Sequence, residues 1–193
     1  RQPLVEFDTE LPSPACVLED LTIAPIDLGT ATHLVLQHLD FSRDCDRADL
    51  REQIAGMVRT RRIAPALAEA VDVDSIVWLM STVLGRMLRE NAGQLRREVP
   101  VYYPIVPPGA SEASDPLDRI MVRGRIDVLI PDSTGLVVAD FKTDRVTEQT
   151  IDQRVEFYRP QVDSYRGAIE RISGQKVKAA YLAFLTPRIL REV

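Results

Sequence analysis

Residues 119–142 constrain the fold of this chain more than any other segment, because two apolar stretches flank a turn. Residues 119–130 alternate with the period of a β-strand, the turn P-D-S-T-G follows, and L-V-V-A-D-F-K is typical of a second strand. The predicted faces of the first strand hold Val122, Gly124, Ile126, Val128 and Ile130 on one side, and Arg123, Arg125, Asp127 and Leu129 on the other. The segment predicts a hairpin, and a turn centred on Ser133 and Thr134 places Asp127 opposite Asp140.

The remaining periodicities predict an α/β (α+β) fold in the order helices, three strands, a helix and a final strand. Helical patterns occupy 27–41, 46–56, 63–70, 73–93 and 147–172, the last with a restart at Pro160. Strands are predicted at 95–103, 119–130, 136–142 and 177–185, with a Pro/Gly/Ser loop at 104–118. Residues 1–26 are rich in proline and are predicted to be an irregular lead-in to one domain at 27–193.

The composition of the chain argues against several classes of protein. The chain has 193 residues and a net charge of −5, which argues against indiscriminate nucleic-acid binding but leaves room for a local basic track. No apolar run has membrane-spanning length and no signal-peptide pattern is present, so we expect a cytosolic protein. The two cysteines cannot supply a four-cysteine iron–sulfur cluster. Because the first residue is Arg and the start is linker-like, we expect a fragment of a larger protein.

The predicted hairpin carries Asp127, Asp140 and Lys142, and these charges need an explanation in a half-buried sheet. A divalent cation would relieve the repulsion between the two carboxylates, and Mg²⁺ prefers such oxygen ligands and keeps waters that a phosphate substrate can displace. The lysine would then orient water or stabilise charge on a phosphorus oxygen. This set of groups favours phosphodiester hydrolysis. The alternative is that the charges form ordinary ion pairs on a solvated sheet face.

The motifs also carry a resemblance. G-R-I-D, D-F-K-T and Q-V-D-S-Y resemble the G-x-x-D, D-x-K-T and Q-x-x-x-Y signature of RecB-like nucleases, a branch of the PD-(D/E)XK superfamily. L-G-T-A-T-H at 28–33 and R-E-V-P at 97–100 resemble two further motifs of that branch. The resemblance covers about residues 27–185 and is strongest to the C-terminal nuclease domain of AddA-type helicase–nuclease subunits. It implies a restriction-endonuclease-like αβββαβ core with additional N-terminal helices. The nominal Pro-Asp pair is Ile126-Asp127 here.

The resemblance also implies roles for individual residues. Asp127 and Asp140 would bind the metal, Lys142 and Glu98 would complete the catalytic set, and His33 and the main-chain carbonyl of Phe141 would be further metal ligands. Gln161 and Tyr165 would position DNA. Mg²⁺ is the expected cofactor, with Mn²⁺ as the alternative. For His33, Glu98, Gln161 and Tyr165 an ordinary packed or surface position is the competing interpretation. Two arginine sets, Arg59, Arg61 and Arg62 or Arg119, Arg123 and Arg125, are candidates for phosphate binding that the sequence does not rank.

The function expected from the resemblance is a metal-dependent DNA exonuclease that acts in double-strand-break repair and recombination in the bacterial cytoplasm. Its partners would be DNA, as single-stranded ends, and a helicase motor. No G-x-x-x-x-G-K-[ST] loop is present, so the motor would lie elsewhere in the full-length chain or in a second helicase–nuclease subunit. Two alternatives stay open: a catalytically silent module that binds DNA ends or a partner, and a metal hydrolase of small phosphates. The sequence does not separate exonuclease from endonuclease action.

Overall fold

The computed structural model describes residues 25–105 and 120–193, and within these ranges the chain forms an α/β fold around one mixed sheet. The strands lie in sequence order: β1 (Arg96–Ile105), β2 (Ile120–Asp132), β3 (Gly135–Lys142), β4 (Val177–Phe184) and β5 (Ile189–Glu192). β3 and β4 are parallel and the other neighbours are antiparallel. The parallel pair requires a crossover, which is helix α6 (Ile151–Ser173). The expected α/β class is thereby confirmed.

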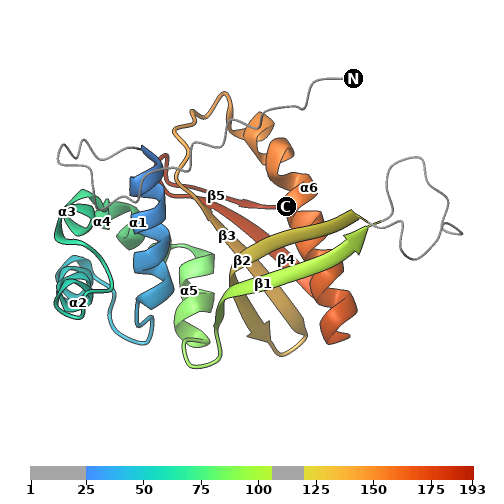
Figure 1. Ribbon diagram of the computed structural model, residues 1–193, viewed down its shortest axis with the longest axis horizontal. Helices are drawn as coiled ribbons and strands as arrows, with labels where there is room; N and C mark the ends of the chain where they lie inside the picture. Colours follow the sequence, from blue (N-terminus) through green and yellow to red (C-terminus); the bar gives the residue numbers. More distant parts are fainter. Residues whose placement is uncertain (1–24, 106–119) are drawn as a thin grey trace, which may run out of the picture.

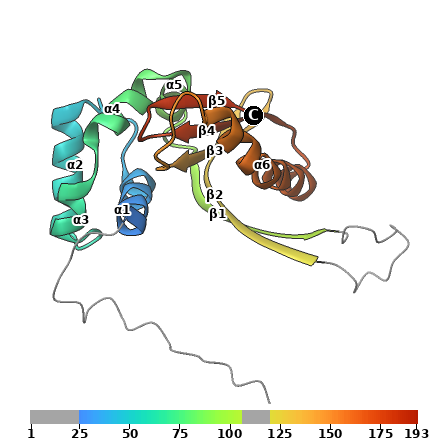
Figure 2. The same ribbon diagram turned by 90° about the horizontal axis from the view of Figure 1, so that it is seen from above.

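Helices cover both faces of the sheet, as Figures 1 and 2 show. On one side lie α1 (Pro25–His38), α2 (Arg47–Arg59), α3 (Pro65–Ala70), α4 (Val73–Ser81) and α5 (Val83–Glu90), and α6 lies on the other. Two apolar clusters follow from this arrangement. One joins the N-terminal helices to Val137, Ala139 and Phe141 of β3, and the other joins α6 to Val138 of the same strand. The strict alternation of β3 therefore makes a core on each side of the sheet.

The register of the hairpin agrees with the sequence prediction. Val128 pairs with Ala139 and Asp132 pairs with Gly135, so the turn lies at Ser133 and Thr134. The ladder between β2 and β3 ends at the Val128–Ala139 pair. Beyond this pair the Phe141 N–H donates to the side chain of Asp127, at 2.7 Å from its Oδ2, instead of to a backbone carbonyl of β2. Asp127 and Asp140 thus lie where the two strands separate.

The predicted assignment of the β2 side chains to faces is wrong at Asp127. Ile126 packs in the α6 cluster, whereas Val128 packs against the N-terminal helices. β1 changes face at the same level: Arg97 donates hydrogen bonds to the carbonyls of Gln37 and Leu39, whereas Val99 packs on the α6 side. Glu98 lies between them with φ of 54°. This left-handed conformation, which costs an L-residue about 1–2 kcal/mol, reverses the side-chain direction within one residue.

The predicted helix at 73–93 is two helices. Thr82 ends α4 and begins α5: its Oγ1 donates to the Leu79 carbonyl at 2.6 Å and accepts the Gly85 N–H at 3.1 Å. This N-cap satisfies a backbone donor that a helix start leaves free, and it stabilises the break. The predicted restart at Pro160 is also wrong. Val155 and Val162 are both buried in the α6 cluster, so packing holds one helix across the proline.

Strand β5 was not predicted, and Pro104 and Ile105 belong to β1 rather than to a loop. The expectations for residues 1–24 and 106–119 lie outside the described residues. No helix in the ranges that the structure describes is long and apolar enough to cross a bilayer.

Gly85 offers a test of the α4–α5 junction. A Cβ at this position would lie 2.3 Å from the Leu79 carbonyl oxygen and 2.5 Å from Met80 Cα, so Gly85→Ala requires backbone movement. We expect a loss of about 2–3 kcal/mol in the free energy of unfolding. Gly167→Ala on α6 is the matched control, because a Cβ there meets nothing within 4 Å. The control should be stabilised by up to about 1 kcal/mol, since alanine favours helix. Urea denaturation of both variants measures the difference; equal stabilities would contradict the prediction.

Candidate active site

Asp140 is the most deeply buried carboxylate of the candidate site, at 3% exposure. It lies on the α6 side of β3, as expected from its alternation with the residues around it. Lys142 follows on the same face, and its Nζ lies 2.5 Å from Asp140 Oδ2 as an ion pair. In the described ranges no hydrogen bond of regular geometry reaches that Oδ2. Burial and the neighbouring Asp127 charge outweigh Lys142 and raise the pKa of Asp140 to about 6.

Lys142 is held by side chains of α6. Its Nζ donates to Gln161 Oε1 at 3.2 Å and lies 4.1 Å from the ring centroid of Tyr158. Gln161 Nε2 in turn donates to the Tyr165 hydroxyl at 2.8 Å, and that oxygen accepts the Arg125 N–H at 3.3 Å. A hydrogen-bonded chain therefore runs from the ammonium to β2. The two residues predicted to position DNA contact Lys142 and the strand that carries Asp127.

Gly124 permits the contact between α6 and β2. A Cβ on Gly124 would lie 2.7 Å from Tyr165 Cε1, closer than real Cβ atoms approach. The glycine of the G-R-I-D motif thus leaves room for the tyrosine of the Q-V-D-S-Y motif. Local sequence alone does not show this dependence, because the two residues are far apart along the chain.

His33 reaches the site from α1, on the opposite side of the sheet. Its Nδ1 donates to the Gly29 carbonyl and its Nε2 to the Phe141 carbonyl, both at 2.9 Å, and Nε2 lies 3.2 Å from Asp127 Oδ2. Because both ring nitrogens donate to carbonyls, the ring carries two protons. Burial lowers the pKa of His33, but the hydrogen bond and charge of Asp127 and the two carbonyls outweigh it and raise the pKa to about 9. His33 places a positive charge at two oxygens predicted to bind the metal.

Glu98 lies near the other predicted residues. Its carboxylate accepts a hydrogen bond from Arg125 Nη1 at 3.0 Å, and it lines the same hollow as His33 and Asp127. Its φ of 54° is a strained conformation for a non-glycine residue, and such residues are often found at functional sites. The structure therefore brings Glu98 to the site but gives it an arginine partner.

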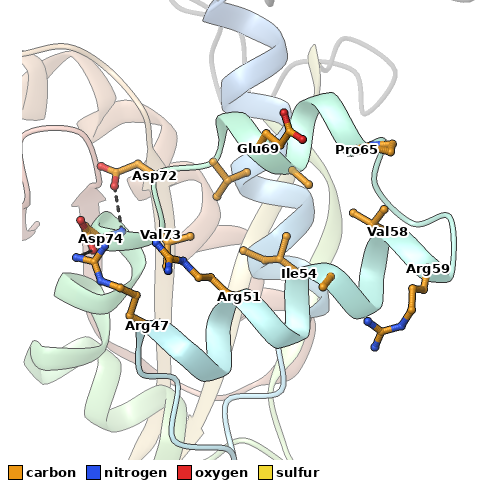
Figure 3. Close-up of a pocket in the computed structure, with 13 residues that line it drawn as sticks. Arg47, Arg51, Ile54, Val58, Arg59, Pro65, Glu69, Asp72, Val73 and Asp74 are labelled. Atoms are coloured by element: carbon orange, nitrogen blue, oxygen red, sulfur yellow. Dashed lines mark hydrogen bonds and ion pairs between the residues drawn. The ribbon is translucent and has the colours of Figure 1, made fainter.

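The candidate site residues line a cleft at the end of the sheet. A hollow of about 620 Å³ is lined by the two aspartates, Lys142, Tyr158 and Gln161, and it adjoins the hollow that contains Glu98. Figure 3 shows a different groove, between α2 and the segment 65–74, with Arg51 and Arg59 at its rim. Its aspartates have structural roles: Asp72, which also lines the cleft, caps α4, and Asp74 pairs with Arg47. The candidate catalytic residues Asp127, Asp140 and Lys142 therefore line the cleft and not the groove.

Tyr158 and Asp144 were not predicted as site residues. The Tyr158 hydroxyl donates to Asp144 Oδ2 at 2.9 Å, and Arg154 binds the other oxygen of that carboxylate at 2.5 Å. Burial and the contact with Asp144 raise the pKa of Tyr158 to about 12, so the phenol stays protonated. A signal was present, since Tyr158 lies three and seven residues before Gln161 and Tyr165 and thus shares their helix face.

The donor set of the cleft fits a divalent cation of the Mg²⁺ type. Asp127, Asp140 and the Phe141 carbonyl offer hard oxygen atoms, and the buried Oδ2 of Asp140 lacks a regular hydrogen bond within the described ranges. Over residues 25–105 and 120–193 no group of three or more His, Cys, Asp or Glu side chains is arranged as a complete metal cage. Mg²⁺ is commonly held by one or two carboxylates together with waters and substrate phosphates, so a complete cage is not required.

Comparison with known sequences identifies the class of protein that this fold and cleft define. Residues 9–192 match the PD-(D/E)XK nuclease superfamily, and the chain belongs to this superfamily. It is therefore a nuclease domain, and members of the superfamily generally use divalent metal ions. The resemblance of the sequence motifs to nucleases of the PD-(D/E)XK superfamily is thereby confirmed.

Individual relatives are more specific. An ATP-dependent helicase/nuclease subunit from Anoxybacillus flavithermus is 35% identical over 181 residues, which cover 91% of this chain and 14% of that protein. The proteins of the same name from Desulforudis audaxviator and Moorella thermoacetica are 37% and 35% identical, over 83% and 89% of this chain and 13% and 12% of theirs. The chain thus matches a small part of these long relatives.

Proposed function

We propose that this chain is the nuclease part of a longer helicase–nuclease and hydrolyses DNA phosphodiester bonds in a metal-dependent reaction. The observation that carries the proposal is the convergence of Asp127, Asp140 and Lys142 in one cleft, with the lysine fixed by Gln161 and Tyr158. The relatives that are named as helicase/nuclease subunits support the wider assembly. The proposed setting is DNA-break repair in the bacterial cytoplasm, and the proposed mode is exonucleolytic trimming of ends.

Asp127, Asp140 and the Phe141 carbonyl would hold Mg²⁺, with Mn²⁺ as a substitute and His33 as a further ligand once it loses a proton. The bound cation would acidify a water molecule and stabilise negative charge on the phosphate. Lys142 would orient the attacking water or donate a hydrogen bond to a non-bridging phosphate oxygen. Gln161 would fix the Lys142 ammonium, and Tyr165 would fix Gln161, so the helix sets the position of the charge. Glu98 would hold Arg125 at the mouth of the cleft.

The decisive experiment is cleavage of end-labelled single-stranded DNA with Mg²⁺ or Mn²⁺ by wild type, Asp127→Asn and Asp132→Asn. Asp132 is the matched control, because it lies on the same strand but pairs with Lys178 outside the cleft. We expect Asp127→Asn to reduce the rate on the order of 10²–10³-fold and the control to keep it. Calorimetry with Mn²⁺ gives a readout that does not depend on turnover. Binding of Mn²⁺ should weaken in Asp127→Asn and stay unchanged in Asp132→Asn.

Two results would contradict the proposal. A wild-type chain that binds no divalent cation and cleaves no DNA would favour a silent DNA-binding module. Faster hydrolysis of a small phosphodiester than of DNA would favour a hydrolase of small phosphates.

A further inference from the structure

The outer part of β2 forms a ribbon that leaves the sheet. Residues 120–126 pair with β1 and, within the described ranges, with no other strand. Figures 1 and 2 show β1 and β2 extending away from β3 as a two-stranded arm. At about 3.3 Å per residue this part of β2 spans roughly 20 Å. Two-stranded ribbons are only marginally stable in isolation, and their exposed edges favour unwanted pairing with other chains. We therefore expect an arm of this kind to have a function.

The two faces of the arm differ in chemistry. The face toward α6 carries Val101 and Ile126, both buried, and Gly124, which contacts Tyr165. The opposite face carries Arg123 and Arg125, with Tyr102 directly across from Arg123. The Arg123 guanidinium lies 5.7 Å from the centroid of the Tyr102 ring, and Tyr102 is 54% exposed. This face, here called the open face, is thus basic and aromatic.

The open face continues into the cleft. Arg125 lines both hollows of the cleft beside Asp127 and His33. Arg123 is two residues further out on the same face, and no carboxylate of the described residues pairs with it. Along one face of a strand the side chains repeat at about 6.6 Å. The open face therefore presents two arginines, Arg125 paired with Glu98 and Arg123 further out, in a line that begins next to the candidate metal-binding carboxylates.

We propose that the open face of the β1–β2 arm is a track for single-stranded DNA, on which Tyr102 stacks against a base and Arg123 and Arg125 bind backbone phosphates. The inference deepens the proposed function, on which it rests, by assigning the path that leads the strand to the cleft. Tyr102 and Arg123 are positioning residues, since neither reaches the carboxylates. Between the two arginine sets left open by the sequence, the structure favours the set that includes Arg123 and Arg125.

Single-stranded DNA is favoured over duplex DNA by the exposed ring. A base can stack on Tyr102 only when it has left its own stack, and aromatic platforms flanked by basic groups are the usual means of binding unpaired strands without sequence preference. In a duplex the base faces are covered, so a protruding tyrosine would gain little. Met121, also on the open face and 60% exposed, adds apolar surface next to this pair.

The test measures binding of fluorescein-labelled dT20 by anisotropy in EDTA, where cleavage cannot occur. We expect Tyr102→Ala to weaken binding on the order of 10-fold, Tyr102→Phe to bind like wild type, and Arg123→Ala to reduce the salt slope by about one. Arg86→Ala is the control, because Arg86 is an exposed arginine of α5 that does not line the cleft. A dT20 carrying several abasic residues should remove the difference between wild type and Tyr102→Ala. Thermal melts of each variant establish that the fold is intact.

Several outcomes would overturn the track. Equal binding of dT20 by wild type and Tyr102→Ala would remove the stacking role, and an undiminished effect with the abasic strand would do the same. An equal loss for blunt duplex DNA would show a duplex contact instead. If Tyr102→Ala keeps wild-type kcat and KM on long single strands with Mg²⁺, the nuclease function stands and the track fails. If dT20 binding depends on Tyr102 but neither the wild type nor any variant cleaves DNA, the track stands and the nuclease function fails.

Discussion

Lys142→Met is expected to lower the rate of Mg²⁺-dependent DNA cleavage on the order of 10²–10³-fold. Methionine keeps the length and apolar stem of lysine but removes the charge that lies 2.5 Å from Asp140 Oδ2 and donates to Gln161. A preorganised ammonium in a buried cleft acts on charge that develops in the transition state, so its loss should lower kcat more than it raises KM. Lys142→Arg should not restore the rate, because a planar guanidinium does not fit a site built for a compact ammonium.

Lys178→Met provides the control for Lys142→Met. Lys178 is also a strand lysine, but it pairs with Asp132 away from the cleft. The measurement is single-turnover cleavage of a 5′-labelled oligonucleotide, with an accompanying thermal melt. If Lys142→Met cleaves within about threefold of wild type while Lys178→Met is unchanged, the role assigned to Lys142 in preorganised electrostatic stabilisation is wrong.

Asp140→Asn is expected to abolish cleavage and yet to stabilise the metal-free protein at neutral pH. The pKa of Asp140 is raised to about 6 from its ordinary value of 3.8, because burial and Asp127 disfavour the charge more than Lys142 favours it. The folded state thus holds this proton more tightly than the unfolded state, and its stability falls as pH rises from about 4 to about 6. Asparagine resembles the protonated carboxyl and avoids that loss. The gain should be on the order of 3 kcal/mol above pH 7 and should vanish below about pH 4.

The experiment compares melting temperatures in EDTA at pH 7.5 and pH 3.5, then adds Mn²⁺ at pH 7.5. Wild type should gain stability from the cation by mass action and Asp140→Asn should not. Asp132→Asn is a control of opposite sign, because Lys178 and Thr134 lower the pKa of Asp132 to about 2, so its charged form is favoured in the folded state. A destabilised Asp140→Asn at pH 7.5 would show that the ion pair with Lys142 outweighs the burial of charge.

The hairpin and its acidic pair were accessible from the sequence because the information is local. Alternation and turn residues define the register around Ser133 and Thr134, and Asp140 and Lys142 share a face by strand periodicity. The spacing of Gln161 and Tyr165 likewise predicts one helix face, and both side chains reach the lysine or its neighbours. The resemblance added His33 and Glu98, which the structure also brings to the cleft.

Other features were not accessible because they depend on contacts between distant segments. The face reversal at Asp127 lies at the level of Glu98 on the neighbouring strand, which has a left-handed conformation, and the periodicity of β2 does not indicate it. The break at Thr82 depends on which backbone donors the cap satisfies, and the continuity of α6 through Pro160 depends on burial of its flanking valines.

Residue identity and local period therefore predicted a pair of carboxylates and a lysine on two adjacent strands, a set of groups that favours phosphodiester hydrolysis. Packing established where those groups point: His33 approaches from α1, Tyr158 and Gln161 hold Lys142 from α6, and the arm projects with Tyr102 and Arg123 exposed. The physical reason is that backbone hydrogen bonding acts between near neighbours or along regular ladders, whereas burial, charge and close approach depend on segments that meet only after folding.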